Sequence, residues 1–103
     1  MSHPSLRLDD TVHQRVRLGI LAVLGEAKRA DFSYLRSALD VSDGNLSRHI
    51  QVLEEAGLVR VEKGFEGRRP RTWVSATRAG RAALGAELDA MRELIARVED
   101  GAG

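Results

Sequence analysis

The segment from Ser42 to Thr77 constrains the fold most, because its hydrophobic periodicity changes once, at Gly57. Before Gly57 the apolar residues recur every three or four positions, which is typical of a helix with one buried face. After Gly57, valines alternate with charged residues, which indicates a strand. A glycine just past a helix suits the left-handed conformation that commonly ends one. The segment therefore predicts a helix, a sharp stop and a β-hairpin in direct succession.

The preceding part of the chain reads as two helices. A first helix is predicted from a cap at Asp9 or Asp10 to about Leu24, and a second, short helix follows a cap at Asp31. A tight turn then leads into the third helix, which Ser42 caps. A short helix, a tight turn and a further helix form the helix-turn-helix pattern.

The hairpin is predicted to begin at Val59, to turn in a loop bracketed by Gly64 and Gly67, and to return over residues 72–76. The strands flank a basic stretch that ends in Arg-Arg-Pro-Arg. A basic hairpin directly after a helix-turn-helix is what a winged helix-turn-helix requires.

A last helix is predicted from Arg78 to Val98, after a cap at Thr77. Its length would be roughly 31 Å, at about 1.5 Å per residue. Its apolar seam repeats every three or four residues and consists of Leu84, Leu88, Met91, Ile95 and Val98. Because so small a body cannot cover this helix, we expect a homodimer interface, to which Val12 and Val16 of the first helix also contribute. The alternative is a terminal helix that folds back onto the first helix.

The predicted fold class is therefore mostly α with a small β-hairpin wing: a winged helix-turn-helix with a long C-terminal dimerisation helix. We expect a flexible N-terminus over residues 1–8, a winged helix-turn-helix DNA-binding domain over 9–77, the dimerisation helix over 78–98, and a flexible tail over 99–103.

Charge is distributed unevenly, although the net charge is only +1. Residues 60–71 contain five cations against two acids, whereas residues 84–103 contain two cations against five acids. A basic middle and an acidic end predict that one part of the protein meets a polyanion and the other has a different role.

The third helix carries polar side chains of the kind that read base edges. Arg48 suits a bidentate contact with guanine, and Gln51 suits adenine. The residues predicted to contact DNA from this helix and its cap are Ser42, Gly44, Asn45, Ser47, Arg48 and Gln51. The alternative for this face is an ordinary solvated helix surface.

The hairpin supplies the cations predicted to contact phosphate, with one guanidinium able to enter a minor groove. They are Lys63, Arg68, Arg69 and Arg71. The alternative is a charged hairpin tip without a partner.

Other functional classes have little support. The chain has no cysteine, and its three histidines are dispersed, so we predict no metal site and no cofactor. Neither a nucleophile–base pair nor a carboxylate constellation is visible, so we predict no catalytic residues. No apolar run approaches the roughly 20 residues that span a bilayer, and no secretory signal is present, so we expect a soluble, cytoplasmic protein.

Five segments in this order resemble the MarR/ArsR-type winged helix transcriptional regulators, in particular small, stand-alone dimeric members. They are residues 30–35, 43–50, 53–59, 65–73 and 77–81. The resemblance implies a homodimer that is held by its terminal helices and binds a near-palindromic operator in double-stranded DNA. We expect a sequence-specific regulator that acts as a repressor rather than an activator, because a bound dimer occludes polymerase. The absence of cysteine departs from members that sense through thiolates.

Two questions stay open at this point. A winged helix can instead serve as a protein–protein interaction module without DNA binding. A small-molecule effector is compatible with the space between the first and terminal helices, but nothing in the sequence selects one.

Overall fold

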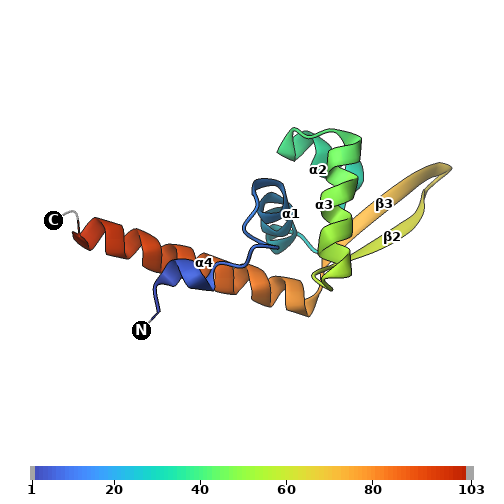
Figure 1. The fold of residues 1–103 in the computed structure, drawn as a ribbon. Coiled ribbons are helices and arrows are strands. Elements are labelled where there is room, and N and C mark those ends of the chain that lie inside the picture. Colours follow the sequence, from blue (N-terminus) through green and yellow to red (C-terminus); the bar gives the residue numbers. More distant parts are fainter. Residues whose placement is uncertain (1, 102–103) are drawn as a thin grey trace.

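The computed structural model of the protein describes residues 2–101 as helices around a small sheet (Figure 1). In chain order the elements are η1 (Pro4–Arg7, a 3-10 helix), α1 (Arg15–Glu26), β1 (Ala30–Asp31), α2 (Phe32–Leu39), α3 (Asp43–Glu55), β2 (Val59–Glu66), β3 (Arg69–Ala76) and α4 (Arg78–Gly101). The antiparallel sheet has the order β1-β3-β2. This architecture confirms the predicted winged helix-turn-helix with a long C-terminal helix.

Local capping explains why the helix-turn-helix forms where the sequence predicts it. Asp31 Oδ1 accepts the Tyr34 N–H at 2.7 Å and starts α2, and Ser42 Oγ accepts the Asn45 N–H at 3.2 Å and starts α3. Gly57, with φ of 76°, ends the α3 segment in a left-handed conformation. These caps confirm the predicted start of both helices and the stop at glycine.

The hydrophobic core lies where α1, α2 and α3 meet the base of the sheet. Its fully buried side chains include Ile20 and Leu21 from α1, Leu35 from α2, Leu46 from α3 and Val74 from β3. Burying each such side chain contributes roughly 1.5–3 kcal/mol. The polar surfaces of α3 and the hairpin are thus built on one continuous apolar base.

The first helix begins later than predicted. It starts at Arg15, with Gln14 as its cap, rather than after Asp9 or Asp10. Asp9 instead organises a turn, because its side chain accepts the Thr11 N–H at 2.8 Å and its carbonyl accepts the Val12 N–H at 3.0 Å. Competition from this Asx-type turn outweighs the helical spacing of the apolar residues.

The hairpin is longer than predicted. β2 continues to Glu66 and β3 already starts at Arg69, so only Gly67 and Arg68 form the turn. Gly67, with φ of 64°, holds the first central position of this two-residue turn, where a type II′ hairpin requires glycine. Pro70 has no backbone N–H to donate to a neighbouring strand. It is tolerated because β1 pairs with β3 only at Val74 and Trp73, so no strand lies beside Pro70 on that edge of β3.

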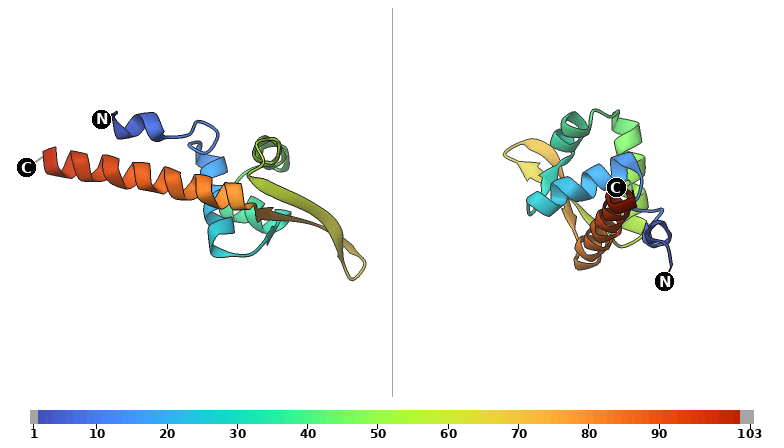
Figure 2. Two further views of the ribbon diagram at one scale, coloured as in Figure 1. Left: turned by 90° about the horizontal axis from the view of Figure 1, so that it is seen from below. Right: turned by 90° about the vertical axis from the view of Figure 1, so that its left-hand side faces the viewer.

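The C-terminal half of α4 and η1 project together from the body, and we call this part the arm (residues 4–7 and 88–101). Figures 1 and 2 show the two segments side by side, on the side of the body away from the hairpin. The arm and the hairpin extend from opposite ends of the body and give the molecule its elongated dimensions of 59 × 24 × 22 Å.

The arm corrects the predicted boundaries at both ends of the chain. Residues 4–7, predicted as flexible, form a helix that His3 caps, with Pro4 buried and an ion pair between Arg7 and Glu93. The last helix continues to Gly101, three residues past the predicted end. The predicted flexible tail lies partly outside the described residues, which exclude 1, 102 and 103.

The apolar residues predicted for the dimer interface fall into two groups. Val12 and Val16 are buried in the core of the single chain, which removes them from any surface that a partner meets. Along α4, Leu84, Leu88 and Met91 are partly buried. Ile95 and Val98 are 56% and 69% exposed. The apolar side chains of this seam therefore become more exposed toward the C-terminal end of the arm.

Among residues 2–101, no helix combines the length and the apolar character that crossing a membrane demands.

Candidate nucleic-acid interface

The exposed face of α3 is mostly polar because Leu46, Ile50 and Leu53 turn toward the core. Leu46, His49, Ile50 and Leu53 are buried, while the residues between them are exposed or nearly so. This division leaves Arg48 and Gln51, the two predicted base-reading residues, on the outer side of the helix. Gln51 Nε2 donates to Glu55 Oε1 at 3.2 Å, one helical turn further on, which orients its amide.

The N-terminal end of α3 is polar and open. The Ser42 hydroxyl accepts the Asn45 N–H, so Ser42 acts as a cap. Nothing lies within 4 Å of the position that a Gly44 side chain would occupy, so this turn of the helix can be approached closely. An ion pair of 2.6 Å between Arg36 of α2 and Asp43 of α3 joins the two helices here.

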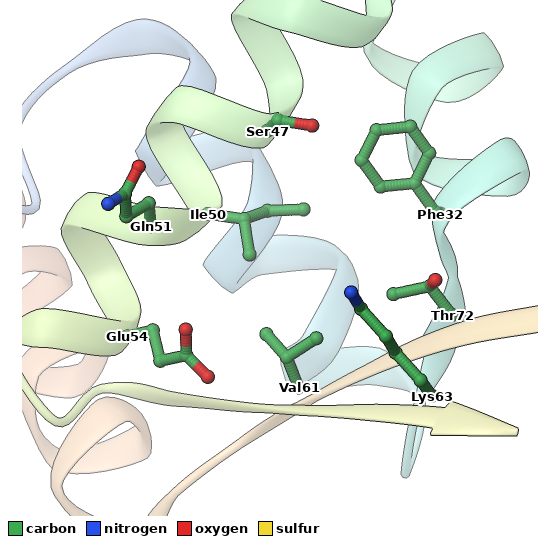
Figure 3. Close-up of a pocket in the computed structure, with 8 residues that line it drawn as sticks. All are labelled: Phe32, Ser47, Ile50, Gln51, Glu54, Val61, Lys63 and Thr72. Atoms are coloured by element: carbon green, nitrogen blue, oxygen red, sulfur yellow. The ribbon is translucent and has the colours of Figure 1, made fainter.

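A cleft of about 340 Å³ separates α3 from the hairpin (Figure 3). Its base is apolar, formed by Ile50 and Val61, and its rim is polar, with Ser47 and Gln51 on α3 and Lys63 on β2. Three predicted DNA contacts thus meet at one cleft. Phe32, Glu54 and Thr72 complete the lining.

The hairpin tip carries two exposed arginines, Arg68 and Arg69, directly after the Gly67 turn. In Figure 1, α3 and the hairpin diverge from their common corner, so that the tip stands apart from α3 across the cleft. The tip cations and the α3 surface therefore face a common space from two sides.

Arg71 behaves differently from the two tip arginines. Its Nη1 donates to Asp31 Oδ2 at 3.0 Å, and its Nη2 lies 3.5 Å from Glu66 Oε1. Its Nε atom is buried without a hydrogen-bond partner. Because Asp31 also caps α2, Arg71 ties the hairpin to the helix-turn-helix and is engaged within the chain.

Sequence reasoning missed several residues of this surface. Arg36 and Phe32 lie on α2, whose apolar spacing indicates only a helix packed against the core. The pairing of Arg71 with Asp31 joins positions 40 residues apart, and no local pattern signals it. A cation–π contact places Arg29 3.9 Å from the Trp73 ring centroid on the far face of the sheet.

His49 is the buried polar residue of α3, and its environment sets its protonation. Burial lowers the pKa of His49 below its ordinary value of 6.5, and the nearby positive charges of Arg17 and Arg48 lower the pKa further. An arginine only donates hydrogen bonds, so the 3.1 Å contact from Arg17 Nη1 requires His49 Nδ1 to accept. His49 is therefore neutral in the folded protein and serves as a hydrogen-bond acceptor.

Within residues 2–101, no group of three or more His, Cys, Asp or Glu side chains is arranged to hold a metal ion.

Comparison with known protein families gives a match to the model described as "Winged helix DNA-binding domain", over residues 16–95. The matched range contains α2, α3, the hairpin and most of α4. An uncharacterized protein from Methanocaldococcus jannaschii is 39% identical over 69 residues, which are 67% of this chain and 75% of that protein.

Solved structures show the same fold. A transcriptional regulator homologue from Pyrococcus horikoshii OT3 is similar with a TM-score of 0.86 and 33% identity, covering 95% of this chain and 98% of that one. The M. tuberculosis regulator MOSR, solved in complex with DNA, has a TM-score of 0.71 and 27% identity, with 92% and 68% covered. A MarR family regulator from Silicibacter pomeroyi has a TM-score of 0.66 and 28% identity, with 85% and 58% covered. These similarities confirm the predicted resemblance to MarR/ArsR-type regulators.

Proposed function

Because the chain belongs to the winged helix DNA-binding domain family, we propose that it is a sequence-specific transcriptional repressor that binds a near-palindromic operator as a homodimer. The observation that carries this proposal is the joint placement of a polar, exposed α3 face and an arginine-tipped hairpin on two sides of one cleft. The similarity to regulators, one of them solved with DNA, supports it.

In this proposal α3 enters the major groove. Arg48 and Gln51 contact base edges, while Ser42, Gly44 and Asn45 bring the N-terminal end of the helix to a phosphate, where free N–H groups favour an anion. Ser47 and Lys63, which face each other across the cleft, hold the sugar–phosphate backbone that separates the two grooves.

The hairpin then clamps the neighbouring backbone. Arg68 and Arg69 supply the charge, because both are exposed at the tip. Arg71 has a supporting role in this scheme, since its ion pair with Asp31 fixes the angle of the hairpin against α2. Rigid attachment of the hairpin lowers the entropy lost when DNA binds.

In this proposal the arm forms the dimer interface with a second copy of the protein. Leu6, Ile95 and Val98 are its large exposed apolar side chains, at 74%, 56% and 69% exposure. Pairing two arms through this surface buries these side chains and continues the seam of Leu84, Leu88 and Met91. Each copy then presents one α3, and the two helices meet successive major grooves roughly 34 Å apart.

Repression follows from occupancy of the operator, because a bound dimer blocks polymerase without a further surface. We propose no catalytic activity, and we place the protein in the cytoplasm with the DNA it binds.

Fluorescence anisotropy with a random-sequence duplex at low ionic strength, followed by a salt titration, tests the proposal. Neutralising six to eight phosphates per dimer predicts a log–log slope of about −5 to −7. An absence of binding at low ionic strength would refute DNA binding and favour the protein-interaction alternative.

A further inference from the structure

A turn formed by residues 9–14 contacts α4 directly through polar groups, and it is connected to α3 through the side chain of Arg17. On the α4 side the contact is Glu87, whose carboxylate is fully buried. Glu87 Oε1 accepts the Asp9 N–H at 3.0 Å, and Glu87 Oε2 lies 2.5 Å from His13 Nδ1. Both oxygens of a buried carboxylate are thus satisfied by the turn.

On its other side the turn contacts Arg17, near the start of α1. Arg17 Nε donates to the Thr11 carbonyl at 2.5 Å, and Arg17 Nη2 donates to the Asp10 carbonyl at 3.2 Å. The third donor, Nη1, reaches His49 of α3 at 3.1 Å. One guanidinium therefore joins the turn to the helix that carries the proposed base-reading residues.

These contacts form a continuous path, which we call the polar bridge: Glu87, the turn of residues 9–14, Arg17 and His49. Its ends are anchored, because Glu87 and His49 are buried and Val12 in the middle of the turn is completely buried. A buried carboxylate that loses a partner incurs a large desolvation penalty, so the path does not open at low cost.

The polar bridge restricts the orientation of the helices, which the apolar contacts around it do not. α4 also packs against α1 and β3, and α1 packs against α3. Apolar packing resists separation but is non-directional, so it tolerates small rotations of one helix against another. Hydrogen bonds weaken steeply when their angles change, and the rigid, planar guanidinium of Arg17 contacts three partners at once.

We propose that Glu87 and Arg17 are positioning residues for DNA recognition, which fix the orientation of α3 relative to the arm through the turn of residues 9–14 and His49. In a dimer that is paired through its arms, this orientation sets the angle at which each α3 meets its groove. The inference rests on the proposed function, and it assigns a role in specificity to residues far from the proposed DNA-contacting surface.

The first test compares affinity for a cognate duplex with affinity for a random duplex, using the full-length protein. Arg17→Lys keeps the charge but cannot reach all three acceptors, and Glu87→Met keeps the volume but removes both acceptor atoms. Each variant is expected to lower the cognate-to-random affinity ratio by about three- to tenfold. Arg15→Lys, the same change at an exposed position two residues away on α1, leaves the ratio unchanged.

Rescue and non-additivity separate positioning from general destabilisation. Glu87→Gln is expected to restore most of the ratio, because its amide oxygen can accept from the Asp9 N–H and its amide nitrogen can donate to a ring nitrogen of His13. The double variant of Arg17→Lys and Glu87→Met loses no more than the worse single variant, since either change interrupts the same path. Fully additive losses, or a ratio that stays at the wild-type value, overturn the proposal.

Hydrogen exchange on the unbound protein provides a readout that does not need DNA. Glu87→Met is expected to raise exchange at the α3 amides around His49 by at least threefold, although Glu87 lies on α4. Unchanged α3 exchange overturns the polar bridge. If the wild-type protein binds no duplex, the proposed function fails, and this exchange measurement still decides whether Glu87 positions α3.

Discussion

The two ends of this elongated molecule differ in what they leave exposed. At one end, α3 and the hairpin expose polar and cationic side chains, with Arg48, Arg68 and Arg69 in open positions. At the other end, the arm exposes Ile95 and Val98 among acidic residues. Both ends rest on the same core.

This contrast indicates a division of tasks. Exposed cations in excess over the acids around them attract a polyanion, whereas exposed apolar side chains on a projecting helix favour another apolar surface. The excess of acids in residues 84–103 repels DNA from the arm. The central claim is therefore that the arm pairs two copies and the α3 end reads DNA.

The largest expected effect comes from breaking the arm. Ile95→Asp combined with Val98→Asp places two charges in the proposed dimer surface, so the protein becomes monomeric in sedimentation. Operator affinity is expected to fall on the order of 1000-fold, because the gain from binding two linked half-sites is lost.

A matched control uses the opposite face of the same helix. Ala82→Asp with Ala86→Asp adds the same charge at exposed positions off the seam. This control should remain dimeric and keep its affinity. If both pairs behave alike, the arm does not act through its apolar seam.

The next effect concerns stability at the contact between α4 and the corner that follows α3. A Cβ atom on Gly80 would lie 1.9 Å from the Leu58 carbonyl oxygen, so Gly80→Ala forces α4 away from the corner after α3. We expect a loss of about 3 kcal/mol in the free energy of unfolding. Gly85→Ala, with nothing within 4 Å of the added methyl, should instead gain about 0.5–1 kcal/mol. Urea unfolding of the two variants measures both, and equal changes would contradict the close approach.

Much of the α3 end was predictable because its signals are local. Ser42 and Gly57 mark the ends of α3 through capping chemistry that acts within a few residues. The start of α1 was not predictable, because the turn before it depends on Arg17 reaching back to the carbonyls of Thr11 and Asp10. A two-residue strand such as β1 also leaves no periodic pattern.

The candidate site was predictable by residue type but not by pairing. Arg68, Arg69 and Arg71 look alike in the sequence, yet only Arg71 has Asp31 as a partner in the fold. The burial of Val12 and Val16 likewise depends on tertiary packing, which helical spacing does not distinguish from a dimer seam.

Two arginines sharpen the contrast within the α3 end. Arg48→Ala is expected to weaken the cognate duplex by about 5- to 100-fold and a random duplex far less, because base contacts carry specificity. Arg69→Ala is expected to weaken both duplexes by similar, smaller factors and to lower the salt slope by about 2 per dimer. Anisotropy titrations on both duplexes distinguish them. Equal losses for Arg48→Ala on both duplexes would remove it as a base reader.

The smallest effect is a pH dependence from His49. Its pKa is lowered in the fold, so the stabilisation from its neutral form is complete above the ordinary value of 6.5 and is lost as the pH falls through the lowered pKa. Thermal unfolding should therefore show a Tm that decreases in this acidic range. In His49→Gln, which cannot titrate, that part of the decrease should disappear, and an unchanged profile would show that other groups cause it.

The most direct test of the central claim is selection of bound fragments from a random duplex pool by the full-length protein. The account predicts a near-palindromic consensus with two half-sites about one helical turn apart, one for each α3. A single half-site without symmetry, or no enrichment over the starting pool, would contradict a paired reader of DNA.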